Sequence, residues 1–226
     1  MKSVIIGAGT YGEVYLAYLQ EAGVEIVGFL DDDPRYINQK VCGIPVLGKL
    51  DFLACLKDEY DVEAVYCPLG NNKLRVEILK CALSLGYEVP NFIHSTVVLS
   101  PNVKIGDKGI YILPKTVIMP WCNIHDFVMM SVNSVVSHHT ILEEGVFLSF
   151  GVNFGASIIA HKYAYIGISA TIMTGVHELG ENCLIGAGAV VIKDVPTNAV
   201  MAGIPAKVLK YLSLIHISEP TRLGMI

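Results

Sequence analysis

The chain has 226 residues, of which 53% are hydrophobic and only 16% are charged, and its formal net charge is −5. Such a chain can form one large domain or two small ones with a sizeable core. The net acidity and the lack of clustered Lys and Arg argue against a nucleic-acid partner. No apolar run approaches the roughly 18 residues that cross a bilayer, so we expect no membrane insertion. The six cysteines are scattered without a CxxC pair, which favours reduced thiols and a cytoplasmic location.

Residues 2 to about 90 alternate between strand-like and helix-like patterns. We expect short apolar strands at 3–6, 25–29 and 64–67, and helices at 11–22, 51–58 and 72–85. This alternation is typical of parallel βαβ units. About ninety residues provide only half of a complete dinucleotide-binding fold. We therefore predict a Rossmann-like α/β domain over residues 1–93.

The second half follows another period, in which an apolar residue recurs at every sixth position. After a first pair, Leu99 and Ile105, the series runs through Ile112, Ile118, Ile124, Met130, Val136, Leu142, Leu148, Phe154, Ala160, Ile166 and Ile172. It slips by one residue and resumes at Leu179, Ile185 and Val191. This period fits neither an amphipathic helix nor a hairpin sheet and indicates a parallel β-helix. We expect it over residues 94–210; a β-sandwich with accidental spacing is the alternative, and spacing alone does not give the handedness.

Several motifs carry a family resemblance. The segments LIGAGAVV at 184–191 and AGIPAK at 202–207 are similar to those of hexapeptide-repeat acyltransferases. With GAGTYG, GFLDDD, GIPVLG and LGNNKLR in the first half, the chain resembles the bacterial sialic acid O-acetyltransferase and UDP-4-amino-sugar N-acetyltransferase family over about residues 2 to 210. The resemblance implies a left-handed β-helix, a homotrimer with active sites at subunit interfaces, and acetyl-CoA as co-substrate. Residues 211–226 fit neither pattern, and we expect a non-native or disordered tail.

The catalytic base is expected in the segment VVSHHT at 135–140. Acetyl transfer needs a base for the acceptor's proton, and histidine suits this near neutral pH. The resemblance implies that His138 is this base, whereas the residues alone also allow a surface histidine. The family's acidic partner is replaced by His139, and Glu143 or Asp126 is an alternative partner. Adjacent strand residues point to opposite faces, so we expect no metal site here.

The resemblance also implies an oxyanion donor one coil beyond the base. The family uses a backbone N–H there, and the position falls on Ala156, preceded by Gly155. Such a donor stabilises the tetrahedral intermediate. A second histidine of the family corresponds to Phe147 here, so whatever that histidine contacts on CoA or substrate must be contacted differently. As an alternative, the two small residues simply suit a β-helix corner.

The motif Gly7-x-Gly9-x-x-Gly12 follows a strand and opens a helix, where backbone N–H groups can approach phosphates. An acidic residue about 20 positions later would suit ribose binding in an NAD enzyme. The resemblance instead implies that this half binds the nucleotide of a sugar substrate. The expected contacts are Gly9, Tyr11, Gly12, Asp31, Asp32, Asn71 and Arg75. Turn glycines and a solvated acidic loop are the alternative.

The resemblance implies contacts to CoA near the end of the repeat. These are Gly203, Pro205 and Lys207 in the last loop, with backbone contacts from Gly155, Ala156, Gly188 and Ala189. A plain β-helix cap is the alternative for the last loop.

Together these features predict an acetyl-CoA-dependent N-acetyltransferase for a nucleotide-linked 4-amino-deoxysugar of bacterial surface-glycan biosynthesis. Loss of the acidic partner of His138 favours an amine over a hydroxyl acceptor. Sugar O-acetylation of the sialic acid type, a non-catalytic nucleotide-binding β-helix and an NAD oxidoreductase are the alternatives. The sequence does not distinguish which sugar is used, or UDP from dTDP.

Overall fold

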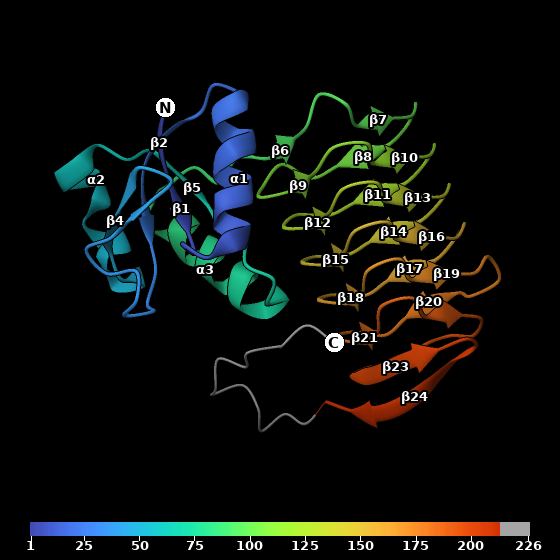
Figure 1. Cartoon of the computed structure of the whole chain (residues 1–226). Helices are drawn as coiled ribbons and strands as arrows, with labels where there is room; N and C mark the ends of the chain where they lie inside the picture. The colour runs from blue at the N-terminus through green and yellow to red at the C-terminus, as the bar shows by residue number, and fades with distance from the viewer. Residues whose placement is uncertain (213–226) are drawn as a thin grey trace.

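The computed structural model describes residues 1–212, so most of the expected tail lies outside the described residues. An α/β half and a tall stack of short strands lie side by side (Figure 1). In the described part of the chain, no helix has the length and apolar character that a membrane span requires.

The first half is built on one five-stranded sheet in the order β3-β4-β2-β1-β5. Its strands are β1 (Lys2–Ile6), β2 (Glu25–Leu30), β3 (Lys40–Val41), β4 (Ile44–Gly48) and β5 (Ala64–Tyr66). The helices are α1 (Thr10–Glu21), the 3₁₀ helix η1 (Leu50–Ala54), α2 (Leu56–Tyr60) and α3 (Asn72–Ser84). The predicted strands and parallel pairing of β1 with β2 and β5 are confirmed.

Two local features of this half differ from the prediction. The expected helix over 51–58 is split into η1 and α2. The antiparallel pair β3–β4 was not predicted from the sequence. Its turn places Cys42 and Gly43 at φ values of 50° and 84°, as a type I′ turn requires. Cys-Gly lacks the Asn-Gly or Asp-Gly signature of such turns, so the sequence gives no clear signal.

The second half is a left-handed parallel β-helix of mostly two-residue strands, as predicted. Sheet C comprises β6 (Phe92–Ile93), β9 (Tyr111–Ile112), β12 (Met129–Met130), β15 (Phe147–Leu148), β18 (Tyr165–Ile166), β21 (Leu184–Ile185), β23 (Ala199–Gly203) and β24 (Ala206–Tyr211). Sheet D comprises β7 (Val98–Leu99), β10 (Val117–Ile118), β13 (Val135–Val136), β16 (Asn153–Phe154), β19 (Thr171–Ile172) and β22 (Val190–Val191). Sheet E comprises β8 (Lys104–Ile105), β11 (Asn123–Ile124), β14 (Ile141–Leu142), β17 (Ile159–Ala160) and β20 (Glu178–Leu179).

The residues of the six-residue series point inward and form the core of the β-helix. From Ile112 to Val191 each is at most 2% exposed. Leu99, in the first coil, is instead 42% exposed because β7 has a neighbouring strand on one side only. The slip before Leu179 falls in the loop between β19 and β20, where Thr174 and Val176 form an isolated bridge around Gly175.

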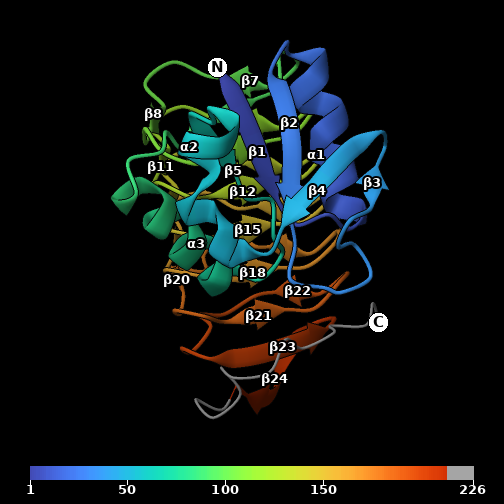
Figure 2. The ribbon, with the colours of Figure 1, turned by 90° about the vertical axis from the view of Figure 1, so that its left-hand side faces the viewer.

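The α/β half covers sheet C. Tyr15 and Leu19 of α1 pack in one cluster with Tyr111, Met129 and Phe147 from the outer side of that sheet. At one end of the β-helix, β21 to β24 extend beyond the α/β half (Figure 2). The three sheets form the sides of a prism, and the chain turns at a corner between one sheet and the next. Tyr11 of α1 contacts the corner between sheets C and D, and Arg75 of α3 contacts the corner between sheets E and C.

Candidate active site

His138 and His139 lie at the third corner, where β13 of sheet D turns into β14 of sheet E. The Nδ1 atoms of the two rings are 3.0 Å apart, and the rings are perpendicular. His139 also stacks on Trp121 of the preceding coil, with ring centroids 5.0 Å apart and planes 25° apart. His138 is half-buried and His139 is exposed. The predicted base thus has a neighbouring imidazole as its hydrogen-bond partner.

The two carboxylates considered as alternative partners of the base are engaged elsewhere. Asp126 accepts the backbone N–H groups of Asp107 and Lys108 at 2.9 and 3.2 Å. Glu143 accepts the Lys162 N–H at 3.2 Å and pairs with the His161 Nδ1 at 3.3 Å. Both carboxylates hold turns of neighbouring coils, so the structure favours His139 as the partner of His138.

Ala156 lies at the same corner one coil beyond His138. Its N–H donates to the Thr174 hydroxyl at 3.3 Å, a long and therefore weak hydrogen bond. Gly155 precedes it, and a Cβ there would come within 2.7 Å of the Ile172 carbonyl and the Thr174 nitrogen. The corner requires glycine at 155, and the Ala156 N–H is engaged within the chain by a hydroxyl that the sequence did not single out.

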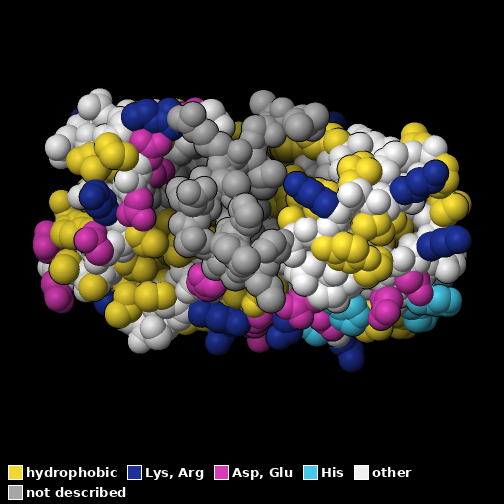
Figure 3. All heavy atoms as spheres, turned by 90° about the horizontal axis from the view of Figure 1, so that it is seen from below, with side chains coloured by type: hydrophobic (Ala, Val, Ile, Leu, Met, Phe, Trp, Pro, Cys, Tyr) yellow, Lys and Arg dark blue, Asp and Glu magenta, His cyan; other side chains and the backbone are white. Residues whose placement is uncertain are grey.

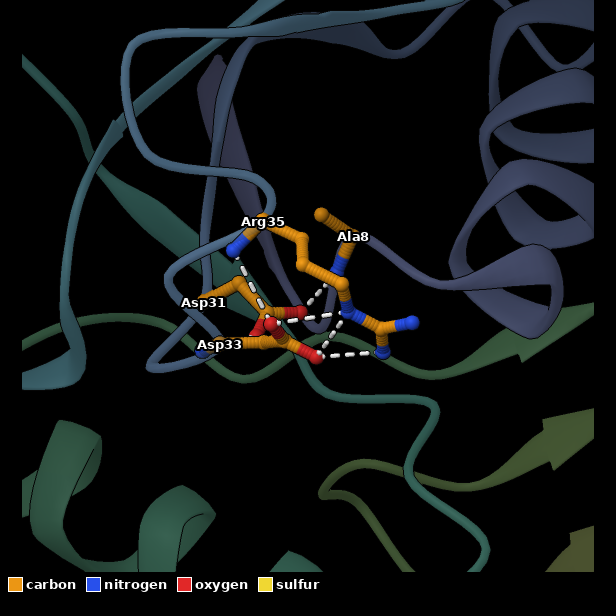
Figure 4. Close-up of polar contacts among 4 residues, drawn as sticks. All are labelled: Ala8, Asp31, Asp33 and Arg35. Atoms are coloured by element: carbon orange, nitrogen blue, oxygen red, sulfur yellow. Dashed lines mark hydrogen bonds and ion pairs between the residues drawn. The ribbon is translucent and has the colours of Figure 1, made fainter.

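The residues expected to bind the nucleotide lie at the edge formed by the carboxyl ends of β1 and β2, where ligands of such sheets bind. We call this the nucleotide edge. The Asp31 carboxylate accepts the N–H groups of Ala8 and Asp33 at 2.7 and 2.8 Å, and Asp33 pairs with Arg35 (Figure 4). Asp32 accepts the Leu50 N–H at 2.9 Å. These carboxylates therefore hold the loops in place, which sequence reasoning did not anticipate.

Two glycines and Tyr11 give this edge its shape. A Cβ at Gly12 would overlap the Gly7 carbonyl oxygen, so Gly12 serves close packing of α1 on β1. Gly9 is extended, and a Cβ there would meet only the Tyr36 hydroxyl, at 3.9 Å. The Tyr11 hydroxyl makes a 2.7 Å hydrogen bond with Ser131 of the β-helix. Of the three, Gly9 has the open surroundings that a ligand would need.

The expectation that Arg75 contacts the nucleotide sugar is wrong, because its side chain is 0% exposed. Its guanidinium donates to the Leu69 carbonyl, the Asn72 side chain and the Gly145 carbonyl at 2.8, 2.8 and 2.9 Å. Burial lowers the pKa of Arg75 to about 10, which leaves it charged at neutral pH. Asn71 is exposed and caps α3 by accepting the Leu74 N–H at 3.1 Å.

The expected CoA contacts fall on the two edges of sheet D. Gly155 and Ala156 are at the corner of sheets D and E, whereas Gly188 lies at the corner of sheets C and D. The exposed Gly203, Pro205 and Lys207 belong to the hairpin of β23 and β24. Ala189 is 0% exposed, and its N–H and carbonyl bond to Gly186 and Thr171. The expected backbone contact from Ala189 is therefore wrong in this conformation.

The outer faces of the two uncovered sheets differ in chemistry. The outward residues of sheet D include Val98, which is 52% exposed, with Val117, Val135 and Val190; Met173 and Ile192, which directly follow β19 and β22, are 46% and 49% exposed. Sheet E carries charged groups, and an open depression of about 370 Å³ there is lined by residues including Lys104, His125 and Asp126. Seen from the end of the β-helix that holds β24, histidine side chains gather beside acidic ones along one edge (Figure 3). Among residues 1–212, no group of three or more His, Cys, Asp or Glu is arranged to hold a metal ion.

Fold and site together define a β-helical protein of hexapeptide repeats joined to a Rossmann-like α/β half. Residues 2–81 match the family model described as the PglD N-terminal domain. The galactoside O-acetyltransferase of Escherichia coli K12 is 35% identical over 86 residues, which are 38% of this chain and 39% of that protein. The chain therefore spans well under half of this curated relative.

Solved structures match almost the whole chain. PerB from Caulobacter crescentus, in complex with CoA and GDP-perosamine, is 28% identical with a TM-score of 0.84 and covers 93% of this chain and 98% of its own. The acetyltransferase domain of PglB from Neisseria gonorrhoeae is 29% identical with a TM-score of 0.82, covering 92% and 99%. Over almost its whole length the chain is therefore similar to bacterial sugar acetyltransferases with hexapeptide repeats.

Proposed function

We propose that the chain is an acetyl-CoA-dependent N-acetyltransferase that acts on a nucleotide-linked 4-amino-deoxysugar in surface-glycan biosynthesis, with His138 as general base. The observation that carries the proposal is the position of His138 at a corner beside the apolar sheet D, in a fold shared over 93% of the chain with PerB. PerB was solved with CoA and a nucleotide sugar. The six unpaired cysteines fit the cytoplasmic location that we propose with this reaction.

In the proposed reaction, the neutral amine attacks the thioester carbonyl carbon as Nε2 of His138 accepts the amine proton. The C–S bond then breaks, and CoA leaves as a thiolate that takes up the proton. The N–H of Ala156 is the proposed oxyanion donor, since its weak bond to Thr174 can be exchanged for a bond to the developing charge. Asp31 and Asp32 act by holding the loop around Gly9, where the nucleotide is proposed to bind.

The geometry supports a shared site in a homotrimer. Tyr11 reaches Ser131 at the corner of sheets C and D, so the nucleotide edge adjoins that corner. His138 lies at the corner of sheets D and E, on the far edge of sheet D. That edge is roughly 15 Å away at about 3.3 Å per residue. A second copy seated on sheet D would bury its apolar side chains and bring the base of one chain to the nucleotide half of another.

The proposal is tested by supplying acetyl-CoA with amino and hydroxy forms of UDP-, dTDP- and GDP-linked sugars. We expect transfer to an amine, and loss of turnover in His138→Ala while CoA still binds. The matched control is His125→Ala, which removes a histidine that bonds to Asn123 on sheet E. Transfer only to the hydroxy form would identify an O-acetyltransferase, and CoA and nucleotide-sugar binding without turnover would identify a non-catalytic protein.

Shared sites are tested by subunit mixing. Gly9→Phe would block the nucleotide loop without strain, because residue 9 is extended at φ −73° and ψ 178°. Neither Gly9→Phe nor His138→Ala should be active alone, whereas co-expressed chains should regain activity in mixed oligomers. Light scattering should give three chain masses. A monomer in solution, or mixed oligomers that stay inactive, would overturn the shared site.

A further inference from the structure

The predicted base, His138, is supported by a residue that lies outside the segment VVSHHT. Trp121 lies one coil before His139, and both occupy the left-handed region, at φ 60° and 58°. The His139 N–H donates to the Pro120 carbonyl at 3.2 Å, so the two corners are in register. The indole therefore lies against the His139 ring, at a centroid distance of 5.0 Å. Stacking against the indole restricts rotation of the His139 ring.

The contact between the two histidines holds a single proton. Their Nδ1 atoms are 3.0 Å apart, and a hydrogen bond between two ring nitrogens needs one donor and one bare acceptor. If His139 donated, the proton of neutral His138 would sit on Nε2, which could then not act as base. If His138 donates from Nδ1, its Nε2 is free to receive a proton. The bond also survives when His138 becomes an imidazolium.

We propose that His139 and Trp121 are positioning residues of the base: Trp121 fixes the His139 ring, and neutral His139 accepts the Nδ1–H of His138. This inference rests on the proposed function. A neutral acceptor selects the tautomer of the base as a carboxylate would, but adds no charge to stabilise the imidazolium. The enzyme should therefore keep its activity to lower pH than a variant with a carboxylate at position 139.

The side chains next to His138 and His139 add no charge of their own. Trp121, Pro120 and Ala156 are uncharged, and the nearby Cys122 thiol donates to the Ser137 carbonyl at 3.1 Å. Burial raises the pKa of Cys122, so it stays neutral. On the adjoining sheet E, His125 bonds to Asn123 at 3.0 Å, and Asp126 and Glu143 are engaged as described above.

The test compares the pH dependence of kcat/KM for four variants. His139→Asp should move the acid limb to higher pH by about one unit. His139→Asn, whose amide oxygen also accepts but does not titrate, should leave the limb in place. Trp121→Ala should lower kcat about tenfold with unchanged KM, and Trp121→Phe should restore most of it. An acid limb that His139→Asp leaves unmoved, or a Trp121→Ala effect confined to KM, would overturn the inference.

A second readout does not depend on activity. In protein with ¹⁵N-labelled histidine, long-range ¹H–¹⁵N spectra report which ring nitrogen carries the proton. His138, assigned by its loss in His138→Ala, should be protonated at Nδ1 in the wild type and become a tautomer mixture in Trp121→Ala. An Nε2-protonated His138 in the wild type would refute the inference. Inactivity with every sugar, together with Nδ1 protonation, would refute only the proposed function.

Discussion

Arg75→Met should weaken the joint between the two halves. Arg75 of α3 is fully buried and donates to two carbonyls of the β-helix, Gly145 at 2.9 Å and Phe127 at 3.4 Å. It also holds Leu69 and Asn72 within its own half. Methionine fits a similar space but leaves these buried acceptors without their donor.

The expected loss of unfolding free energy follows from the number of hydrogen bonds that Arg75 donates. Three bonds of 2.9 Å or less to a charged donor contribute about 1.5 kcal/mol or more each. Removing the cation recovers part of its desolvation cost, which leaves a net loss of about 3–5 kcal/mol, as for other broken buried charge contacts. The matched control is Arg35→Met, which should leave the free energy of unfolding close to that of the wild type because the Arg35 side chain is 70% exposed.

The assay is urea unfolding followed by two probes. Far-UV circular dichroism reports the whole chain, and fluorescence of the single tryptophan, Trp121, reports the β-helix. In Arg75→Met the dichroism should begin to change at lower urea than the fluorescence, because the α/β half loses its anchor. A loss below about 1 kcal/mol, or one equal to that of Arg35→Met, would refute this reasoning.

Three further changes test other contacts. Gly12→Ala should cost more than about 2 kcal/mol because its Cβ overlaps the Gly7 carbonyl, whereas Gly70→Ala, with open space around it, should be close to neutral by urea unfolding. Tyr11→Phe should lose about 1 kcal/mol with its bond to Ser131, and no loss would show that water replaces it. Burial lowers the pKa of His161, but its hydrogen bonds to Glu178 and Glu143 outweigh burial and raise it. Its stabilising contribution is then full below about pH 6.5 and lost as pH rises through the folded value. The stability difference from His161→Gln should therefore shrink from about 0.5 kcal/mol at about pH 5.5 to near zero at about pH 8, and an opposite trend would exclude this pairing.

The repeat could be predicted because each inward residue stacks on its equivalent one coil away. Burial of Ile118, Val136 and Phe154 on one side of the core follows from this translation alone. The slip before Leu179 was visible in the sequence for the same reason. The expectation that His138 and His139 are adjacent strand residues with side chains on opposite faces is wrong, because both follow β13 at a corner, where their Nδ1 atoms lie 3.0 Å apart.

Contacts between the halves could not be predicted in this way. Arg75 has the sequence context of a polar helix residue next to the LGNN loop, and its burial depends on carbonyls 52 and 70 residues further along the chain. The partners of Asp31 and the stacking of Trp121 on His139 likewise depend on backbone turns. No periodicity encodes which group accepts which hydrogen bond.

The parallel pairing of strands also spaces the coils of the β-helix evenly. Adjacent coils are spaced at the strand separation of about 4.8 Å, so Trp121, His139 and Ser157 mark equal steps along a single edge. Removing or adding one complete turn of the prism would change its length without altering the surroundings of a distant step. A single side chain at one such position can therefore be exchanged, and the chemistry of that coil altered, while the backbone that spaces the coils is conserved.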